Sequence, residues 1–142
     1  MTKQEQNKEI VIRYNKEFVE QGNIQILYEI IDPEFINHSV PSGISKGPDG
    51  VLYYFNFFLR PAFPDIKVEI FDLVAEGDKV VAHKTLQATH KGDFLDMAAT
   101  NKEVAIDVID IIYLKDGKYI EQWSLMDLDK VMMQITDQEK VF

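Results

Sequence analysis

The sequence contains no cysteine, which excludes a disulfide framework and thiol catalysis and fits a reducing compartment. No apolar run approaches the roughly 18–20 residues that a membrane-spanning helix needs. The first residues, MTKQEQNKEI, also lack the apolar segment of a secretory leader. We therefore expect a cytoplasmic protein that has no membrane partner.

Positive charge is also scarce. Fifteen Lys and Arg residues face 24 Asp and Glu residues, which gives a formal net charge of -9, and the basic residues are scattered. Nucleic-acid binding requires concentrated positive charge, so we expect no nucleic-acid partner. The chain has no Gly-rich phosphate loop, serine elbow or paired metal-ligand motif, and we expect neither a cofactor nor a metal. Its length of 142 residues favours a single domain over residues 1–142.

The first half of the chain has helical patterns. Apolar side chains recur at spacings of three and four over residues 4–20, as in Val11, Tyr14 and Phe18. A second helix is predicted to begin at residue 24, with Asn23 as its cap, and to end at Pro33. A third is predicted to begin at Pro48, to carry an aromatic stripe and to be ended by Pro61 and Pro64.

The second half reads as consecutive strands, over residues 67–75, 80–92, 103–114 and 119–126. The Asp116-Gly117 pair between two apolar strands predicts a tight hairpin turn. A last helix is expected from Leu128, with Asp127 as its cap and with a frayed end. Helices followed by hairpins predict an α+β fold with an antiparallel sheet.

Two aspartates interrupt the apolar strand at residues 103–114. Asp107 and Asp110 are three positions apart, and an odd offset along a strand points two side chains to opposite faces of the sheet. Either can be a solvated aspartate, but a strand that is apolar on both faces favours one inward carboxylate. A carboxyl group held in an apolar cavity can act as a general acid or base near neutral pH.

Other polar and aromatic residues have two interpretations each. His83 and Gln87 share one face of the preceding strand, where they can line a pocket, with His83 as a proton-transfer residue, or serve the structure alone. Asn37 can hold a ligand carbonyl or cap the backbone of a loop. Tyr54 and Trp123 can form pocket walls or pack in the core.

Four segments carry a family resemblance: DPEFINH, KGPDG, THKGDFLDMAATNKEV and DGKYIEQWSLMD. Together they resemble the SnoaL-like polyketide cyclase, or ester cyclase, family of the nuclear transport factor 2-like superfamily. The resemblance covers almost the whole chain. It implies a cone-shaped α+β barrel, in which a curved antiparallel sheet packs against N-terminal helices around a small-molecule pocket. It also implies a homodimer.

The characterised members of that family resemble cofactor-free enzymes that abstract a proton from a polyketide ester and close a ring by aldol condensation. Asn37 matches the family's pocket asparagine. The family's catalytic aspartate, just after the tryptophan, falls on Ser124, and a pocket histidine of the family falls on Asp110. Our hypothesis is that Asp110 has taken over the acid/base role across the cavity. The polar pocket partners would then be Asn37, His83 and Ser124.

Three functions remain open at this point. The first is a cofactor-independent cyclase or isomerase that acts on a small apolar carbonyl or ester compound. The second is a non-catalytic ligand-binding module, which the serine at position 124 favours. The third is a structural dimer with a filled cone, because this fold hosts catalytic and non-catalytic proteins alike.

Overall fold

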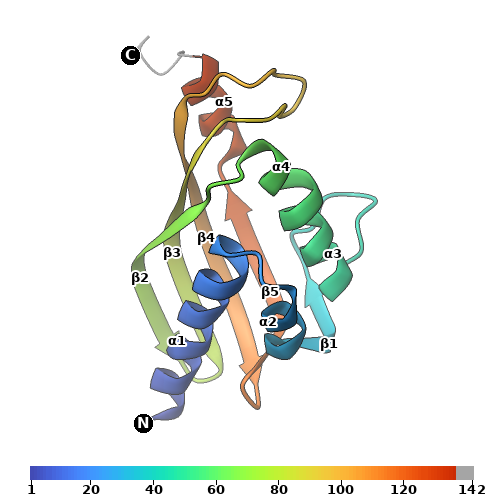
Figure 1. Ribbon diagram of the computed structural model, residues 1–142. Helices are drawn as coiled ribbons and strands as arrows, with labels where there is room; N and C mark the ends of the chain where they lie inside the picture. Colours follow the sequence, from blue (N-terminus) through green and yellow to red (C-terminus); the bar gives the residue numbers. More distant parts are fainter. Residues whose placement is uncertain (137–142) are drawn as a thin grey trace.

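The computed structural model describes residues 1–136 of the chain. Its first half contains α1 (Lys3–Arg13), the π-helix η1 (Tyr14–Glu20), α2 (Ile24–Ile30), β1 (Ile31–Asn37), α3 (Pro48–Tyr53), the π-helix η2 (Tyr54–Leu59) and α4 (Arg60–Ala62). Its second half contains β2 (Lys67–Glu76), β3 (Lys79–Thr89), β4 (Glu103–Lys115), β5 (Lys118–Met126) and α5 (Leu128–Thr136). Figure 1 shows the helices of the first half in front of the long strands of the second.

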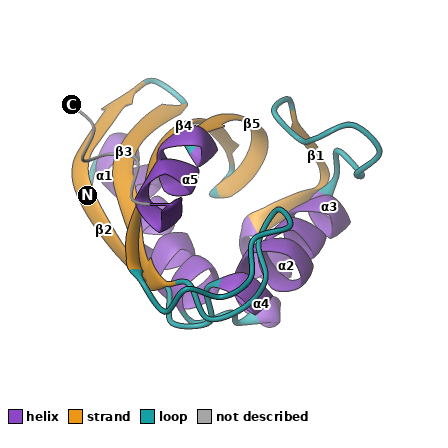
Figure 2. Cartoon of the chain, turned by 90° about the horizontal axis from the view of Figure 1, so that it is seen from above, coloured by secondary structure: helices purple, strands orange, loops and turns teal. Residues whose placement is uncertain are grey.

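The strands form a single five-stranded sheet in the order β1-β5-β4-β3-β2. All neighbours are antiparallel except β1, which runs parallel to β5 at the edge. The sheet is strongly curved, and the helices lie along its concave side (Figure 2). The fold is therefore the predicted α+β architecture, with N-terminal helices packed against a curved sheet.

The concave face of β3 and β4 consists of their even-numbered residues. Val80, Ala82 and Leu86 on β3, and Ile106 and Val108 on β4, are buried. Odd-numbered neighbours are mostly exposed or half-buried, as strand geometry requires. The helices cover this face with buried side chains such as Val11, Phe18 and Leu27.

Local signals in the sequence identified most element ends. The Asn23 side chain accepts a hydrogen bond from the Gln25 amide and caps α2, and Pro48 occupies the first turn of α3. Asp116 and Gly117 both have positive φ, as a tight hairpin turn requires. Asp127 accepts a hydrogen bond from the Lys130 amide, which confirms the predicted cap.

The prediction that Pro33 ends the second helix was imprecise. The second helix already ends at Ile30, and Pro33 lies in β1, an edge strand where a missing N–H is tolerated. The third helical segment passes through Pro61, which lies in the first turn of α4, and ends at Ala62, between the two prolines predicted to end it. The expected fraying of the last helix falls on residues 137–142, outside the described part.

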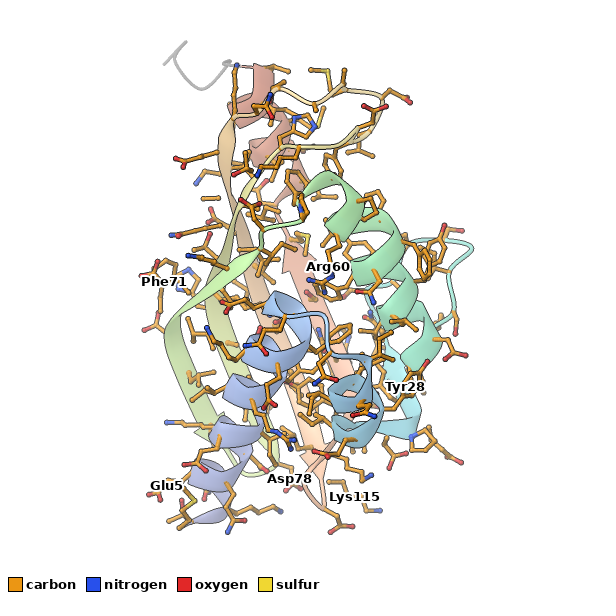
Figure 3. All side chains as sticks on the ribbon, in the orientation of Figure 1. Glu5, Tyr28, Arg60, Phe71, Asp78 and Lys115 are labelled. Atoms are coloured by element: carbon orange, nitrogen blue, oxygen red, sulfur yellow. The ribbon has the colours of Figure 1, made fainter. Side chains whose placement is uncertain are left out.

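Arg60 joins the two helical segments. Its guanidinium donates hydrogen bonds to the carbonyl oxygens of Phe18 and Val19 at 3.1 and 2.9 Å. These carbonyls lie near the end of η1, and that of Phe18 also accepts a hydrogen bond from the Gly22 amide at 2.7 Å. The side chain reaches from the α3–α4 segment toward η1 (Figure 3). Within residues 1–136, no helix has the length and apolar character required to cross a bilayer.

Candidate functional site

A cavity of about 270 Å³ lies between the concave face of the sheet and the helices. That volume is near the lower end of the roughly 300–1,000 Å³ typical of ligand pockets, so it suits a small molecule. Its lining comes from the sheet, the helices and the loop after β1. The lining residues are Tyr14, Asn37, Ser39, Val40, Pro41, Val51, Tyr54, Phe55, Lys84, Leu86, Val108, Asp110, Gln122, Ser124, Leu125, Met126 and Leu128.

A buried ion pair forms one wall of the cavity. Lys84 Nζ lies 2.7 Å from Asp110 Oδ2, and the two side chains are only 4% and 5% exposed. The sheet register explains the contact: Ala82 pairs with Asp110 and Lys84 with Val108, so the two charged residues are diagonal neighbours on the concave face. A charge removed from water in this way is costly unless it is paired.

Two amides complete the polar environment of the ion pair. Lys84 Nζ donates a second hydrogen bond to Asn15 Oδ1 at 2.5 Å. Gln122 Nε2 donates a longer one to Asp110 Oδ1 at 3.4 Å. An ammonium has three N–H donors. Within residues 1–136 two of them have partners in the structure, so one donor and part of the carboxylate remain for a ligand.

Three tyrosines near the ion pair stay neutral at ordinary pH. Burial raises the pKa of Tyr14, and the negative charge of Asp110 raises it further. Burial also raises the pKa of Tyr119 well above its usual value, with smaller contributions from Tyr14 and Asp110. At Tyr54, burial raises the pKa to about 12. Tyr14 and Tyr54 line the cavity as neutral phenols, and the Tyr54 hydroxyl donates a hydrogen bond to Met126 Sδ at 3.4 Å.

The loop after β1 forms the rim and is tied to β5. The Ser124 amide donates a hydrogen bond to Ser39 Oγ at 2.8 Å, and Asn37 Oδ1 accepts one from the Ser39 amide at 3.0 Å. On the other side of the sheet, the ring of His38 stacks on Trp123 with 4.3 Å between ring centroids. These contacts hold Ser39 and its neighbours over the cavity.

The structure brings together four of the residues proposed from the sequence. Asp110, Asn37, Tyr54 and Ser124 all line the cavity. Asp107 points away from it and pairs with Lys130 at 2.9 Å. The even-numbered face is therefore the inner one, and Asp110 is the inward aspartate.

Three other expectations need correction. His83 does not lie in the cavity: it is about half exposed, and its Nδ1 lies 3.0 Å from Asp72 Oδ2. Gln87 is exposed too and donates a hydrogen bond to Glu69. Trp123 stacks outside the cavity on His38. All three are at odd positions of their strands, and the covered face is the even one.

Sequence reasoning missed four polar lining residues: Tyr14, Ser39, Lys84 and Gln122. A signal for Lys84 was present, because it interrupts an alternating row of apolar residues that runs from Val80 through Ala82 and Leu86. Lysine is almost never fully buried without a partner, so this row predicts an inward carboxylate opposite it. Among residues 1–136, no group of three or more His, Cys, Asp or Glu side chains could hold a metal ion.

Known proteins share this architecture. A solved polyketide cyclase candidate from Acidithiobacillus ferrooxidans is 27% identical, with a TM-score of 0.84 over 96% of this chain and 99% of that one. A SnoaL-like polyketide cyclase candidate from Jannaschia sp. CCS1 is also 27% identical, with a TM-score of 0.80 over 94% and 93%. IdmH from Streptomyces antibioticus, at 22% identity and a TM-score of 0.84 over 92% and 99%, supports the fold alone. No curated protein matches the chain.

The family model described as SnoaL-like polyketide cyclase matches residues 9–135. That range contains every residue that lines the cavity. The match supports a small-molecule-binding role of the cyclase type. The chain belongs to the SnoaL-like polyketide cyclase family.

Proposed function

We propose that the protein is a cofactor-independent cyclase or isomerase that acts on a small carbonyl or ester compound, with Asp110 as its general acid/base. The observation that carries the proposal is the buried carboxylate of Asp110 on the wall of a cavity of about 270 Å³. A carboxylate on the wall of such a cavity can take a proton directly from a carbon acid that is bound beside it.

The position of Asp110 supports this assignment. It is the direct cross-strand partner of Ser124, the residue at the place of the family's catalytic aspartate. Both side chains line the same cavity. A carboxylate on β4 can therefore address nearly the same region of a ligand as one at position 124 on β5.

The reaction follows from these groups. Asp110 takes a proton from the carbon next to a carbonyl group; the C–H bond breaks and its electron pair moves onto the carbonyl oxygen, giving an enolate. In a cyclase, the enolate carbon attacks a second carbonyl of the same molecule, and the new alkoxide recovers the proton from Asp110. In an isomerase, the proton returns to another carbon. Asn37 and Ser124 can position the substrate by hydrogen bonds.

Hydrogen–deuterium exchange tests the first step without knowledge of the natural substrate. Cyclic ketones and β-keto esters are incubated in D₂O with the protein, and deuterium at the α-carbon is followed by NMR. We expect exchange above the buffer rate, and we expect Asp110→Asn to slow it by roughly 10²–10⁴-fold, the usual contribution of a general base.

The matched control is Asp107→Asn, which changes an aspartate on the same strand that points away from the cavity. It should leave exchange unchanged. Exchange by a folded Asp110→Asn variant at the rate of the unmodified protein would remove Asp110 from the mechanism.

A non-catalytic ligand-binding module is the second candidate, favoured by the serine at position 124. It predicts that ligands raise the melting temperature while no compound undergoes exchange, since a ligand bound only by the native state stabilises it. The size of the cavity counts against the third candidate, a filled cone with a purely structural role.

The homodimer implied by the family resemblance stays a prediction. The convex face of the sheet exposes apolar side chains at Ile109 and Ile111, which a partner copy would cover. Sedimentation equilibrium gives the mass directly, and a monomer at micromolar concentration would contradict the prediction.

A further inference from the structure

We infer that Lys84 is a second catalytic residue, whose ammonium binds the carbonyl oxygen of the substrate, and that the Lys84–Asp110 pair selects neutral enolisable carbonyl compounds. The same pair would bind an enolate anion only when Asp110 takes up a proton at the same time. This inference rests on the proposed function, because it names the substrate class of the same site.

The geometry of the pair fits a carbonyl group and its neighbouring carbon. Lys84 Nζ and Asp110 Oδ2 are 2.7 Å apart on the cavity wall, and one ammonium N–H has no partner within residues 1–136. In a ketone or ester, a single atom separates the carbonyl oxygen from the α-carbon. Adjacent donor and base can therefore contact both at once, the donor on the oxygen and the base on the α-hydrogen.

The charge of the pair determines which ligand form it accepts. Lys84 and Asp110 together carry no net charge. When Asp110 takes the α-proton, the negative charge moves from the carboxylate to the enolate oxygen. The carboxylate and the enolate oxygen both lie beside the Lys84 ammonium. No net charge is created in the buried site, which matters because an unpaired buried charge is expensive.

An anionic ligand would bring a negative charge that the neutral pair does not balance. The ammonium charge is already matched by Asp110, so a bound enolate adds an unpaired negative charge unless Asp110 is protonated. Within residues 1–136, the other ionisable groups that line the cavity or respond to the charge of Asp110 are Tyr14, Tyr54 and Tyr119, which burial keeps neutral. The positive charge of Arg60 lowers the pKa of Tyr14, against the larger effect of burial. The Arg60 guanidinium itself is bound to two backbone carbonyls at the end of η1.

Proton-linked calorimetry tests this without turnover. The probe is 1,3-cyclohexanedione, which is ionised near neutral pH, titrated into the unmodified protein in two buffers of different ionisation enthalpy. We expect uptake of about one proton per bound diketone, the linkage that a protonated Asp110 requires. Cyclohexanone, a neutral ketone of similar size, is the control and should bind without proton uptake.

Two variants separate the roles of the partners. Asp110→Asn should bind the ionised diketone without proton uptake, because an amide cannot take the proton and the Lys84 charge is then free for the enolate. Adding Lys84→Met to that variant should weaken binding by about ten-fold or more. Urea unfolding confirms that both variants are folded.

Several results would overturn the inference. Diketone binding to the unmodified protein without proton uptake would refute the charge argument, as would the absence of millimolar binding. Equal affinities of the two variants would remove Lys84 from the site. None of these readouts depends on catalysis, so a failure of the exchange experiment, which tests Asp110 as a base, is distinguishable from a failure here.

Discussion

Removal of the Lys84 ammonium should strongly destabilise the fold. Lys84→Met keeps the length of the side chain but leaves the carboxylate of Asp110, 5% exposed, without its counter-ion. Breaking a buried pair by removal of one partner costs roughly 3–5 kcal/mol, because the other charge stays buried and unpaired. With an unfolding entropy of about 2.1 cal/mol/K per residue, the melting temperature should fall by roughly 10–17 °C.

The assay is urea unfolding followed by circular dichroism, with Lys84→Met/Asp110→Leu as the matched control. The double variant removes both charges. Its buried defect is the side-chain oxygen of Asn15, which loses its donor, whereas the Gln122 amide, which loses the Asp110 acceptor, is only half-buried and can bind water. An unsatisfied buried acceptor costs about 1–3 kcal/mol. The double variant should therefore recover about 2 kcal/mol relative to Lys84→Met. A single variant at least as stable as the double variant would refute the view that the pair is buried and mutually dependent.

Two further predictions concern the tyrosines and one glycine. Tyr14, Tyr54 and Tyr119 have a raised pKa in the folded state, so the unfolded chain loses these protons first, from about pH 10. Their contribution to stability is complete below pH 10. Above pH 10, the free energy of unfolding should fall by about 1.4 kcal/mol per pH unit for each tyrosine. Urea titrations at increasing pH measure this slope, and a free energy of unfolding that does not change with pH would contradict the burial of the tyrosines. Gly50→Ala would place a Cβ 1.8 Å from the Ser45 carbonyl oxygen, on the loop that carries the cavity rim. We expect a loss of about 1–3 kcal/mol from the forced backbone shift, and unchanged thermal stability would show that the loop moves freely.

Much of the architecture was accessible from local sequence signals. The cap at Asn23, the proline that begins α3 and the Asp116-Gly117 turn each fix a backbone conformation through the residue itself. Such effects act within a few residues and need no partner from elsewhere in the chain. The resemblance of four segments to one family gave the cone-shaped arrangement, which the fold confirms.

The sequence also determined which strand residues share a face. Alternation puts Asp110 with the buried row of β4, and it puts His83 and Gln87 together on β3. It does not determine which face of a strand will be covered, since that depends on the curvature of the sheet and on where the helices pack. The polar row of β3 was expected to line the pocket, yet it lies on the convex face, and Lys84 lies inside.

The ion pair itself was decided only by the tertiary structure. Lys84 and Asp110 are far apart in the chain and become diagonal neighbours through the register of β3 against β4. A shift of one residue in that register would turn one strand's side chains to the other face. The sequence alone therefore determined the kinds of polar group available. The curved sheet and its helices decided which two of them meet away from water, because burial and partner distance are properties of the packed chain.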